Sequence, residues 1–295
     1  MEKLQGKIIR GVGGFYYVHD GQRTVVECRA RGGFRLRDMK PLVGDNAEIV
    51  LTEEDPGSGR IETIFPRKNE LIRPAVANVD QALIVVSAQH PAFHPGLLDR
   101  FLLWMSFQDV PVIVGISKTD LDDEGKEEEI RSLYRQAGVR ILSFSAVNGQ
   151  GIRELEAMLR GTTTVLAGAS GVGKSTLLNC LMTDQAMETA ALSAKLGRGR
   201  HTTRHAEIFC WDKDSFLCDT PGFTALELPE IGEEQLRYYY EEFRGPEQQC
   251  AFRDCLHLKE KGCAVRKAAA DGTLPVGRYE SYCRLLEELR ARKKY

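Results

Sequence analysis

The sequence Gly168-Ala-Ser-Gly-Val-Gly-Lys-Ser175 indicates which fold the chain adopts. A short apolar run, Thr163 to Ala167, precedes it, and residues typical of a helix, Thr176 to Met182, follow it. Glycines at this spacing let backbone N–H groups turn inward around phosphate oxygens at the start of a helix. Lys174 can then reach the β- and γ-phosphates, and the Ser175 hydroxyl can coordinate Mg²⁺. The stretch predicts a nucleotide-binding phosphate loop between a strand and a helix.

A second motif supplies the magnesium side of the site. Asp219-Thr-Pro-Gly222 follows the apolar run Phe216 to Cys218, so Asp219 stands at the end of a predicted buried strand. There its carboxylate can hold the Mg²⁺ shell, and the Gly222 N–H can contact the γ-phosphate. The nucleotide-binding residues expected from the two motifs are Gly168, Ala169, Ser170, Gly171, Val172, Gly173, Lys174, Ser175, Thr176 and Gly222.

Two loops at successive strand ends identify the base. The run Val110 to Ile116 ends in Ser117-Lys-Thr-Asp120, where the lysine stem can lie across a purine face. The Asp120 carboxylate can accept hydrogen bonds from N1–H and the N2 amino group of guanine, and adenine offers neither donor. A further run, Val139 to Phe144, ends in Ser145-Ala146, which suits a backbone N–H contact to guanine O6. The base-reading residues expected are Ser117, Lys118, Thr119, Asp120, Ser145 and Ala146.

The order of these motifs is unusual. In ordinary small GTPases the phosphate loop comes first and the guanine-reading loops come last, whereas here the guanine-reading loops precede the phosphate loop. The order predicts a circularly permuted α/β GTPase domain with a mostly parallel sheet over residues 74–228. Such a permutation joins the Asp219 motif directly to the C-terminal segment, which is then placed to respond to the γ-phosphate.

The segment Gly197-Arg-Gly-Arg-His-Thr-Thr-Arg204 is glycine-rich and cationic, which is typical of a switch loop.

Phe223 occupies the position where Ras-like enzymes carry a glutamine that orients the attacking water, so slow intrinsic hydrolysis is expected. His201 is a candidate catalytic group, and the alternative is a histidine that faces solvent or contacts RNA. The expected magnesium ligands are Ser175, Thr202, Thr203 and Asp219.

Residues 1–73 have the pattern of a small OB-like β-barrel, because short strand-like runs alternate with glycine-rich turns. Between Cys28 and Pro41, five cations stand against the single acid Asp38. Arginines beside an aromatic ring on a barrel face suit an oligonucleotide, and the alternative is an ordinary solvated hairpin. The expected RNA contacts are Arg29, Arg31, Phe34, Arg35 and Arg37.

Residues 229–295 are predicted to form a mainly α-helical domain, with helix-like segments at Gln235 to Phe243 and Tyr279 to Arg292. Between them, one histidine and three cysteines supply four soft ligands for tetrahedral Zn²⁺. Buried cysteines with a chance histidine are the alternative. A closed set of four ligands indicates one structural zinc ion rather than a catalytic one. The predicted ligands are Cys250, Cys255, His257 and Cys263.

The permuted order, the barrel, the sequence Gly199-Arg-His-Thr-Thr-Arg204 and the cysteine-rich segment together closely resemble the ribosome small-subunit-dependent GTPase A family (RsgA). The resemblance covers essentially the whole chain. It implies that barrel, GTPase and zinc domain act together on a late precursor of the small ribosomal subunit, and it favours His201 as the catalytic group. In one departure, Ser117 replaces the usual asparagine. This affects the expected contact to guanine N7 and the tie to the phosphate loop, while the specificity carried by Asp120 is expected to remain.

Composition limits the other possibilities. No apolar stretch in the 295 residues is long enough for a membrane span, and no signal-peptide core is visible, so a cytoplasmic protein without a membrane partner is expected. The net charge of −2 makes any basic footprint local. The nucleotide motifs imply GTP or GDP with Mg²⁺ as a partner, and the family resemblance implies the small ribosomal subunit with its rRNA; a monomer is expected. The rivals are a nucleotide-regulated RNA-binding switch with incidental hydrolysis and a P-loop kinase.

Overall fold

The computed structural model describes residues 3–21, 24–30, 40–53, 55, 57–182, 207–219 and 227–292. The chain forms two compact units, each assembled from segments that are far apart in the sequence. The first unit comprises Met1–Leu83, Ile152–Ala167 and Lys174–Thr224, and the second comprises Ile84–Gly151, Gly168–Gly173 and Ala225–Tyr295. The three domains expected at residues 1–73, 74–228 and 229–295 stay a prediction.

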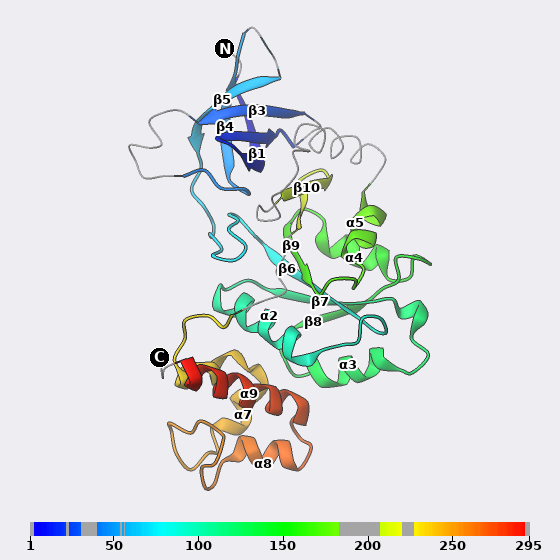
Figure 1. Cartoon of the computed structure of the whole chain (residues 1–295), viewed down its shortest axis with the longest axis vertical. Coiled ribbons are helices and arrows are strands. Elements are labelled where there is room, and N and C mark those ends of the chain that lie inside the picture. Colours follow the sequence, from blue (N-terminus) through cyan, green and yellow to red (C-terminus); the bar gives the residue numbers. More distant parts are fainter. Residues whose placement is uncertain are drawn as a thin grey trace. The chain divides into compact units, whose positions relative to one another are not determined.

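Within the first unit, five strands close into a barrel in the order β1-β2-β3-β5-β4 (Figure 1). Gly13 and Gly14, both at positive φ, form the two-residue turn that a tight hairpin between β1 and β2 requires. The strands are β1 Lys3–Val12, β2 Phe15–His19, β3 Val25–Ala30, β4 Asn46–Leu51 and β5 Ser58–Ile64. The barrel core consists of Ile8, Val18, Val26, Cys28, Ala47, Ile49, Ile61 and Ile64. The predicted N-terminal β-barrel is confirmed.

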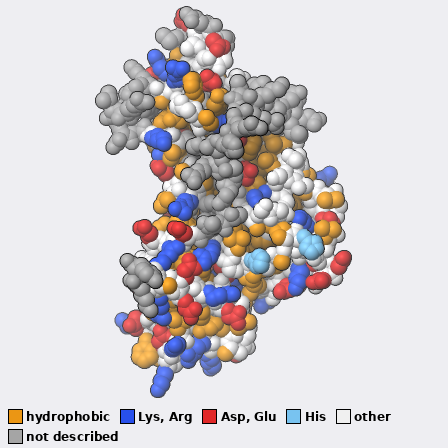
Figure 2. All heavy atoms as spheres, in the orientation of Figure 1, with side chains coloured by type: hydrophobic (Ala, Val, Ile, Leu, Met, Phe, Trp, Pro, Cys, Tyr) orange, Lys and Arg blue, Asp and Glu red, His pale blue; other side chains and the backbone are white. Residues whose placement is uncertain are grey.

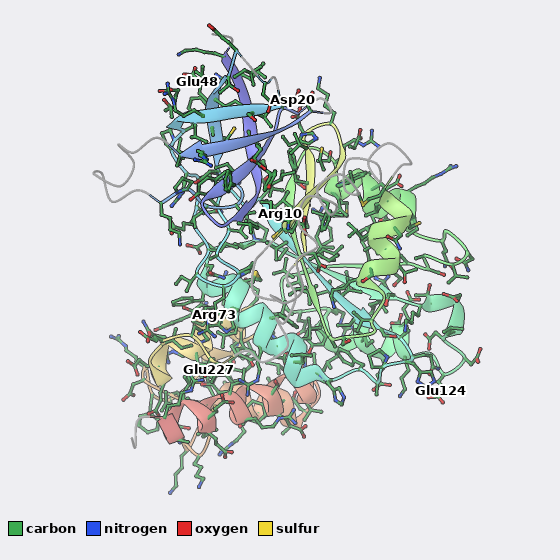
Figure 3. The ribbon with its side chains drawn as sticks, turned by 45° about the horizontal axis from the view of Figure 1, so that its top comes forward. Arg10, Asp20, Glu48, Arg73, Glu124 and Glu227 are labelled. Atoms are coloured by element: carbon green, nitrogen blue, oxygen red, sulfur yellow. The ribbon has the colours of Figure 1, made fainter. Side chains whose placement is uncertain are left out.

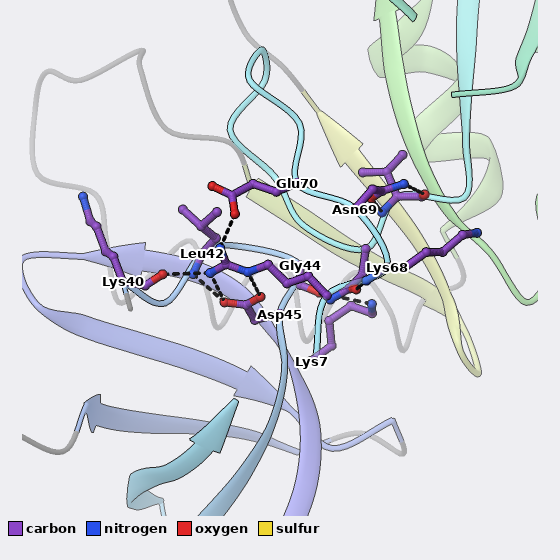
Figure 4. Close-up of polar contacts among 11 residues, drawn as sticks. Lys7, Lys40, Leu42, Gly44, Asp45, Lys68, Asn69 and Glu70 are labelled. Atoms are coloured by element: carbon purple, nitrogen blue, oxygen red, sulfur yellow. Dashed lines mark hydrogen bonds and ion pairs between the residues drawn. The ribbon is translucent and has the colours of Figure 1, made fainter. Parts of the chain in front are cut away.

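A buried carboxylate ties the barrel to the segment that follows β5. The Asp45 side chain is fully buried, and Arg67 Nε and Nη2 donate to its two oxygens at 2.7 and 2.9 Å (Figure 4). Arg67 also donates to the Lys40 carbonyl at 2.8 Å and pairs with Glu70. The hydrogen bond to Asp45 is the main reason that the pKa of Arg67 is raised. Because a buried carboxylate needs such partners, this pairing fixes the path of the chain out of the barrel.

The loop before β4 passes very close to the same segment. Gly44 has a φ of +92°, and a Cβ there would lie 2.1 Å from the Ala77 carbonyl oxygen. The Ala77 N–H donates to the Val43 carbonyl at 2.9 Å, and Asn78 Nδ2 donates to the Gly44 carbonyl at 3.0 Å. Glycine alone permits both this backbone conformation and this approach.

The remaining strands form one sheet in the order β10-β11-β9-β6-β7-β8. Strands β9 and β11 pair in parallel, as do β7 and β8, and β10 pairs antiparallel with β11. The strands are β6 Gln81–Ser87, β7 Val112–Ser117, β8 Arg140–Ser143, β9 Thr163–Gly168, β10 Glu207–Asp212 and β11 Ser215–Asp219. The helices that follow β6 to β9 are α2 Pro95–Phe107, α3 Lys126–Tyr134, α4 Ile152–Leu159 and α5 Lys174–Leu181. This alternation confirms the predicted α/β domain.

The described part of the C-terminal region is helical, as predicted (Figure 1). The helix expected at Gln235 to Phe243 is instead two 3₁₀ helices, because Tyr240 between them has an extended backbone. The last helix begins at Val276, three residues before the predicted start. On the face in Figure 2, basic and acidic side chains are interspersed over this region. Its elements are η2 Glu233–Tyr239, η3 Glu241–Phe243, α7 Arg244–Glu247, α8 Ala264–Ala270 and α9 Val276–Arg292.

Within the described ranges, none of the helices combines the length and the apolar character that crossing a lipid bilayer would require.

A buried arginine joins three helices of the second unit. Arg278 of α9 is 2% exposed, and its guanidinium contacts Asp99 of α2 and, at 2.5 Å, Glu242 of η3. The rings of Tyr134 and Tyr240 lie 5.1 and 4.5 Å from its Cζ. Burial lowers the pKa of Arg278, but the charges of Asp99 and Glu242 outweigh burial and the pKa is raised. Because a buried charge is costly unless it is paired, these contacts specify how α9 packs.

Replacing Gly44 with alanine tests the close approach to Ala77. Gly14 is a matched control because its φ is +87°, yet a Cβ there would meet nothing within 4 Å. Both substitutions share the strain of positive φ, about 1–2 kcal/mol. Gly44→Ala should lower the free energy of unfolding by a further ~1–3 kcal/mol, because the new methyl group meets backbone. Urea denaturation measures both losses, and equal losses would contradict the close approach.

Candidate nucleotide-binding site and metal centre

The phosphate loop begins at the end of β9. Gly168 has a φ of +140°, and a Cβ there would lie 2.2 Å from the Val85 carbonyl oxygen of β6. Gly171 and Gly173 have φ values of +80° and +99°, and Val172 between them is 3% exposed. The loop therefore requires glycine at three positions and is anchored by one buried side chain. This is the conformation expected of a loop whose N–H groups surround phosphate oxygens.

The residues expected to carry charge at the phosphates lie in the first unit. Lys174 begins α5, with Ser175 and Thr176 in its first turn, and Asp219 ends β11. Burial lowers the pKa of Lys174, and the charge of Asp219 opposes this effect. The structure thus brings Lys174 within electrostatic reach of Asp219. The Ser175 hydroxyl and the Asp219 carboxylate are oxygen donors of the kind that Mg²⁺ prefers, so this pair fits the expected ion.

The first loop that is predicted to read the base is bonded to the phosphate loop. Lys118 adopts a left-handed conformation with a φ of +59° directly after β7. Its Nζ donates to the Gly171 carbonyl at 2.8 Å and to the His90 carbonyl. Both ends of the lysine stem are therefore held, which suits a side chain that lies across a purine. Asp120 lies in the 3₁₀ helix η1 Thr119–Leu121, and its side chain is exposed.

Ser117 contacts the phosphate loop, although it stands where the family usually has an asparagine. Its Oγ lies 2.6 Å from the Val172 carbonyl of the phosphate loop and 2.9 Å from the Val86 carbonyl of β6. The side chain is buried, with 2% exposure. A hydroxyl therefore connects β7 to the phosphate loop in place of an amide.

The second loop that is predicted to read the base is shaped by Ser145. This residue is fully buried, and its Oγ accepts hydrogen bonds from the Val147 and Asn148 N–H groups at 3.2 and 3.3 Å. Gly151 closes the loop at a φ of +72°, where a Cβ would lie 2.1 Å from the Ser143 carbonyl oxygen. Ser145 therefore holds the loop that presents the partly exposed Ala146.

The four predicted metal ligands converge. The ligand atoms of Cys250, Cys255, His257 and Cys263 all lie within 4.8 Å of one another. His257 Nδ1 is 3.7 Å from the Cys250 sulfur and 3.5 Å from the Cys263 sulfur. Zn²⁺ bonds of 2.3 Å to sulfur and 2.0–2.1 Å to nitrogen, at tetrahedral angles, give such S···N separations of about 3.5 Å. The cluster therefore fits a tetrahedral metal ion.

The surrounding residues orient these ligands. The Ala264 N–H donates to the Cys250 sulfur and the Arg266 N–H to the Cys263 sulfur, each at 3.4 Å. Burial lowers the pKa of His257 to about 4, so its ring is neutral at pH 7, as a metal ligand must be. The Glu247 carboxylate lies 3.9 Å from the buried Nε2 of His257.

Several predicted site residues lie outside the described residues. They are Arg31, Phe34, Arg35, Arg37, His201, Thr202, Thr203 and Gly222. Among the expected RNA contacts, Arg29 on β3 is described, and its guanidinium lies 4.6 Å above the Phe15 ring of β2. Figure 3 labels Arg10 on β1, whose guanidinium lies 5.8 Å from the Tyr17 ring. Among the residues that the structure describes, the barrel therefore carries two arginine–aromatic pairs.

Three groups that contact the candidate site residues were not predicted from the sequence. The His90 carbonyl acts through its backbone, so no residue pattern marks it. Phe15 faces Arg29 across the β2–β3 ladder, and the glycine turn after β1 could have located it by strand register. Glu247 could have been found from its position three residues before the first cysteine ligand, since histidine ligands usually have a carboxylate partner.

The sequence matches the model of the RsgA GTPase family over residues 64–229 and that of the RsgA N-terminal domain over residues 5–58. A relative from Agathobacter rectalis, named small ribosomal subunit biogenesis GTPase RsgA, is 43% identical over 302 residues, covering 99% of this chain and 100% of that protein. The solved structure of YloQ, described as a circularly permuted GTPase, has a TM-score of 0.76 and 38% identity, covering 99% of this chain and 96% of that one. The structure of YjeQ from Thermotoga maritima has a TM-score of 0.79 and 35% identity, covering 98% and 99%. The chain therefore belongs to the RsgA GTPase family, and its GTPase domain has the circularly permuted order.

Proposed function

We propose that this chain hydrolyses GTP to GDP and phosphate during biogenesis of the small ribosomal subunit, and that the subunit stimulates the reaction. The observation that carries the proposal is the bonding of the base-reading loop to the phosphate loop, through Lys118 and the Gly171 carbonyl and through Ser117 and the Val172 carbonyl. A loop that reads guanine and a loop that binds phosphates are thereby held together. The name of the Agathobacter rectalis relative supports the ribosomal partner.

Each part of the proposed site has a distinct task. Backbone N–H groups of the phosphate loop and the Lys174 ammonium bind the phosphates, and Asp120 pairs with N1–H and N2 of guanine. Mg²⁺, when bound, neutralises charge on the phosphates. Ser175 and Asp219 would hold that ion, with Thr202 or Thr203 adding a hydroxyl. The Gly222 N–H would contact the γ-phosphate.

Catalysis requires a group that orients water, and Phe223 cannot do so. His201 is the proposed group, because its imidazole can accept a hydrogen bond from the attacking water. Docking on the subunit would fix the loop that carries it. We therefore expect slow turnover without the subunit, on the order of 10⁻⁴ to 10⁻³ s⁻¹.

The barrel and the C-terminal region are the proposed docking elements. The exposed Arg29 with Phe15 offers a cation and a ring to RNA, and the arginines at 31, 35 and 37 extend the same segment. The four-ligand cluster would hold one structural Zn²⁺, because three thiolates and an imidazole are the ligands that this ion prefers. Occupation of all four positions leaves the ion no open position for chemistry.

GTP hydrolysis with and without purified small ribosomal subunits tests the proposal. Subunits should raise the turnover rate at least tenfold and should have no such effect on ATP, because Asp120 pairs with guanine. A rate that subunits leave unchanged, with nucleotide-dependent RNA binding retained, would instead indicate a switch with incidental hydrolysis.

Asp120→Asn tests the base-reading loop. The amide can donate to the C2 oxygen of xanthine but repels the guanine amino group, so GTP affinity should fall and xanthosine triphosphate affinity should rise. Titration of both nucleotides measures the change. An unaltered preference for GTP would remove Asp120 from this role.

His201→Ala tests the catalytic group. GTP affinity and subunit binding should stay nearly intact, while the subunit-stimulated rate should fall by about 10²-fold. Lys174→Ala is the contrasting variant, since it should impair nucleotide binding itself. A stimulated rate within about twofold of the parent would exclude His201.

Cys255→Ser tests the metal centre. The purified protein should lose its bound zinc, expected at one ion per chain, because one of four ligands is replaced. Cys180→Ser is the control, since Cys180 is exposed in α5 and belongs to no ligand cluster of the described residues. Mass spectrometry measures the zinc content of both variants. Full zinc content in Cys255→Ser would refute this ligand set.

A further inference from the structure

We infer that Ser117 is a positioning residue that fixes the phosphate loop, and that guanine is bound without a hydrogen bond from this residue to N7. The inference rests on the proposed function, since it concerns how the same site holds its base. The site should therefore accept guanine nucleotides that are altered at N7 as well as unmodified ones.

The geometry around the hydroxyl is the first step. Ser117 is the last residue of β7, and Lys118 and Asp120 follow it at once. Its Oγ lies 2.6 Å from the Val172 carbonyl oxygen and 2.9 Å from the Val86 carbonyl oxygen. Both neighbours are acceptors, and both distances are within hydrogen-bond range.

The donor count is the second step. A serine hydroxyl has one hydrogen to donate, and guanine N7 can only accept. Two carbonyl oxygens already compete for that single hydrogen, so a bond to N7 would leave both without it. Val172 is 3% exposed and Ser117 is 2% exposed, so water cannot readily replace the missing donor at the Val172 carbonyl. The hydrogen therefore stays with the backbone carbonyls.

An asparagine at this position would behave differently. Its amide carries two hydrogens, so it could donate to the phosphate loop and still donate to N7. Serine retains the first of these tasks and gives up the second. Recognition of guanine then rests on N1–H and N2 through Asp120 and on O6 through the Ser145–Ala146 loop.

Competition between nucleotides measures how much N7 of guanine contributes to binding. GDP and 7-deaza-GDP, in which a C–H replaces N7, each displace a fluorescent GDP analogue from the wild-type protein. The two affinities should agree within about twofold. Ser117→Ala should weaken both nucleotides by the same factor, about tenfold, because the phosphate loop loses its tie. Ser281→Ala, a buried serine in α9, controls for the general effect of removing a buried hydroxyl and should change neither affinity.

The outcomes separate this inference from the proposed function. Failure of the wild-type protein to bind GDP in preference to ADP would overturn the proposed function. GDP binding with a tenfold or larger preference over 7-deaza-GDP would overturn the inference alone. An unweakened affinity in Ser117→Ala would also overturn it, because the hydroxyl would then have no positioning task.

Discussion

The close passage of the phosphate loop along the end of β6 is the constraint on which the site depends. A side chain at Gly168 would meet the Val85 carbonyl at 2.2 Å, so the chain can turn there only without a Cβ. The same turn brings the Val172 carbonyl to Ser117 and the Gly171 carbonyl to Lys118. Backbone geometry and two side chains thus hold together the loops proposed to bind the phosphates and to read the base.

Buried charges organise the rest of the chain in a similar way. Asp45 and Arg67 fix the exit from the barrel, and Arg278 fixes α9 against α2 and η3 through its two carboxylates. A buried charge is costly unless its partners are well placed, so each pairing favours one arrangement over its alternatives. Within each unit, a buried ion pair therefore fixes the path of the chain next to a proposed docking element.

Local motifs explain why much of this was predictable. Three motifs are short in sequence and each is typical of one chemistry: the phosphate loop, the Ser117–Asp120 loop and the four metal ligands. The barrel could be predicted from its strand-like runs and glycine turns. The acceptors of Lys118 and Ser117 are backbone carbonyls from distant segments, which no residue type reveals. Asp99 and Arg278 are 179 residues apart, so only tertiary packing pairs them. His201 and the arginines at 31, 35 and 37 lie outside the described residues and stay predictions.

The central proposal is GTP hydrolysis stimulated by the small ribosomal subunit, which requires the nucleotide site and the docking on the subunit to be coupled. Co-sedimentation of the purified chain with small subunits, in the presence of a non-hydrolysable GTP analogue or of GDP, tests it most directly. The proposal predicts that the fraction of protein in the subunit pellet differs clearly between the two nucleotides. An equal fraction in both, or absence from the pellet in both, would contradict it.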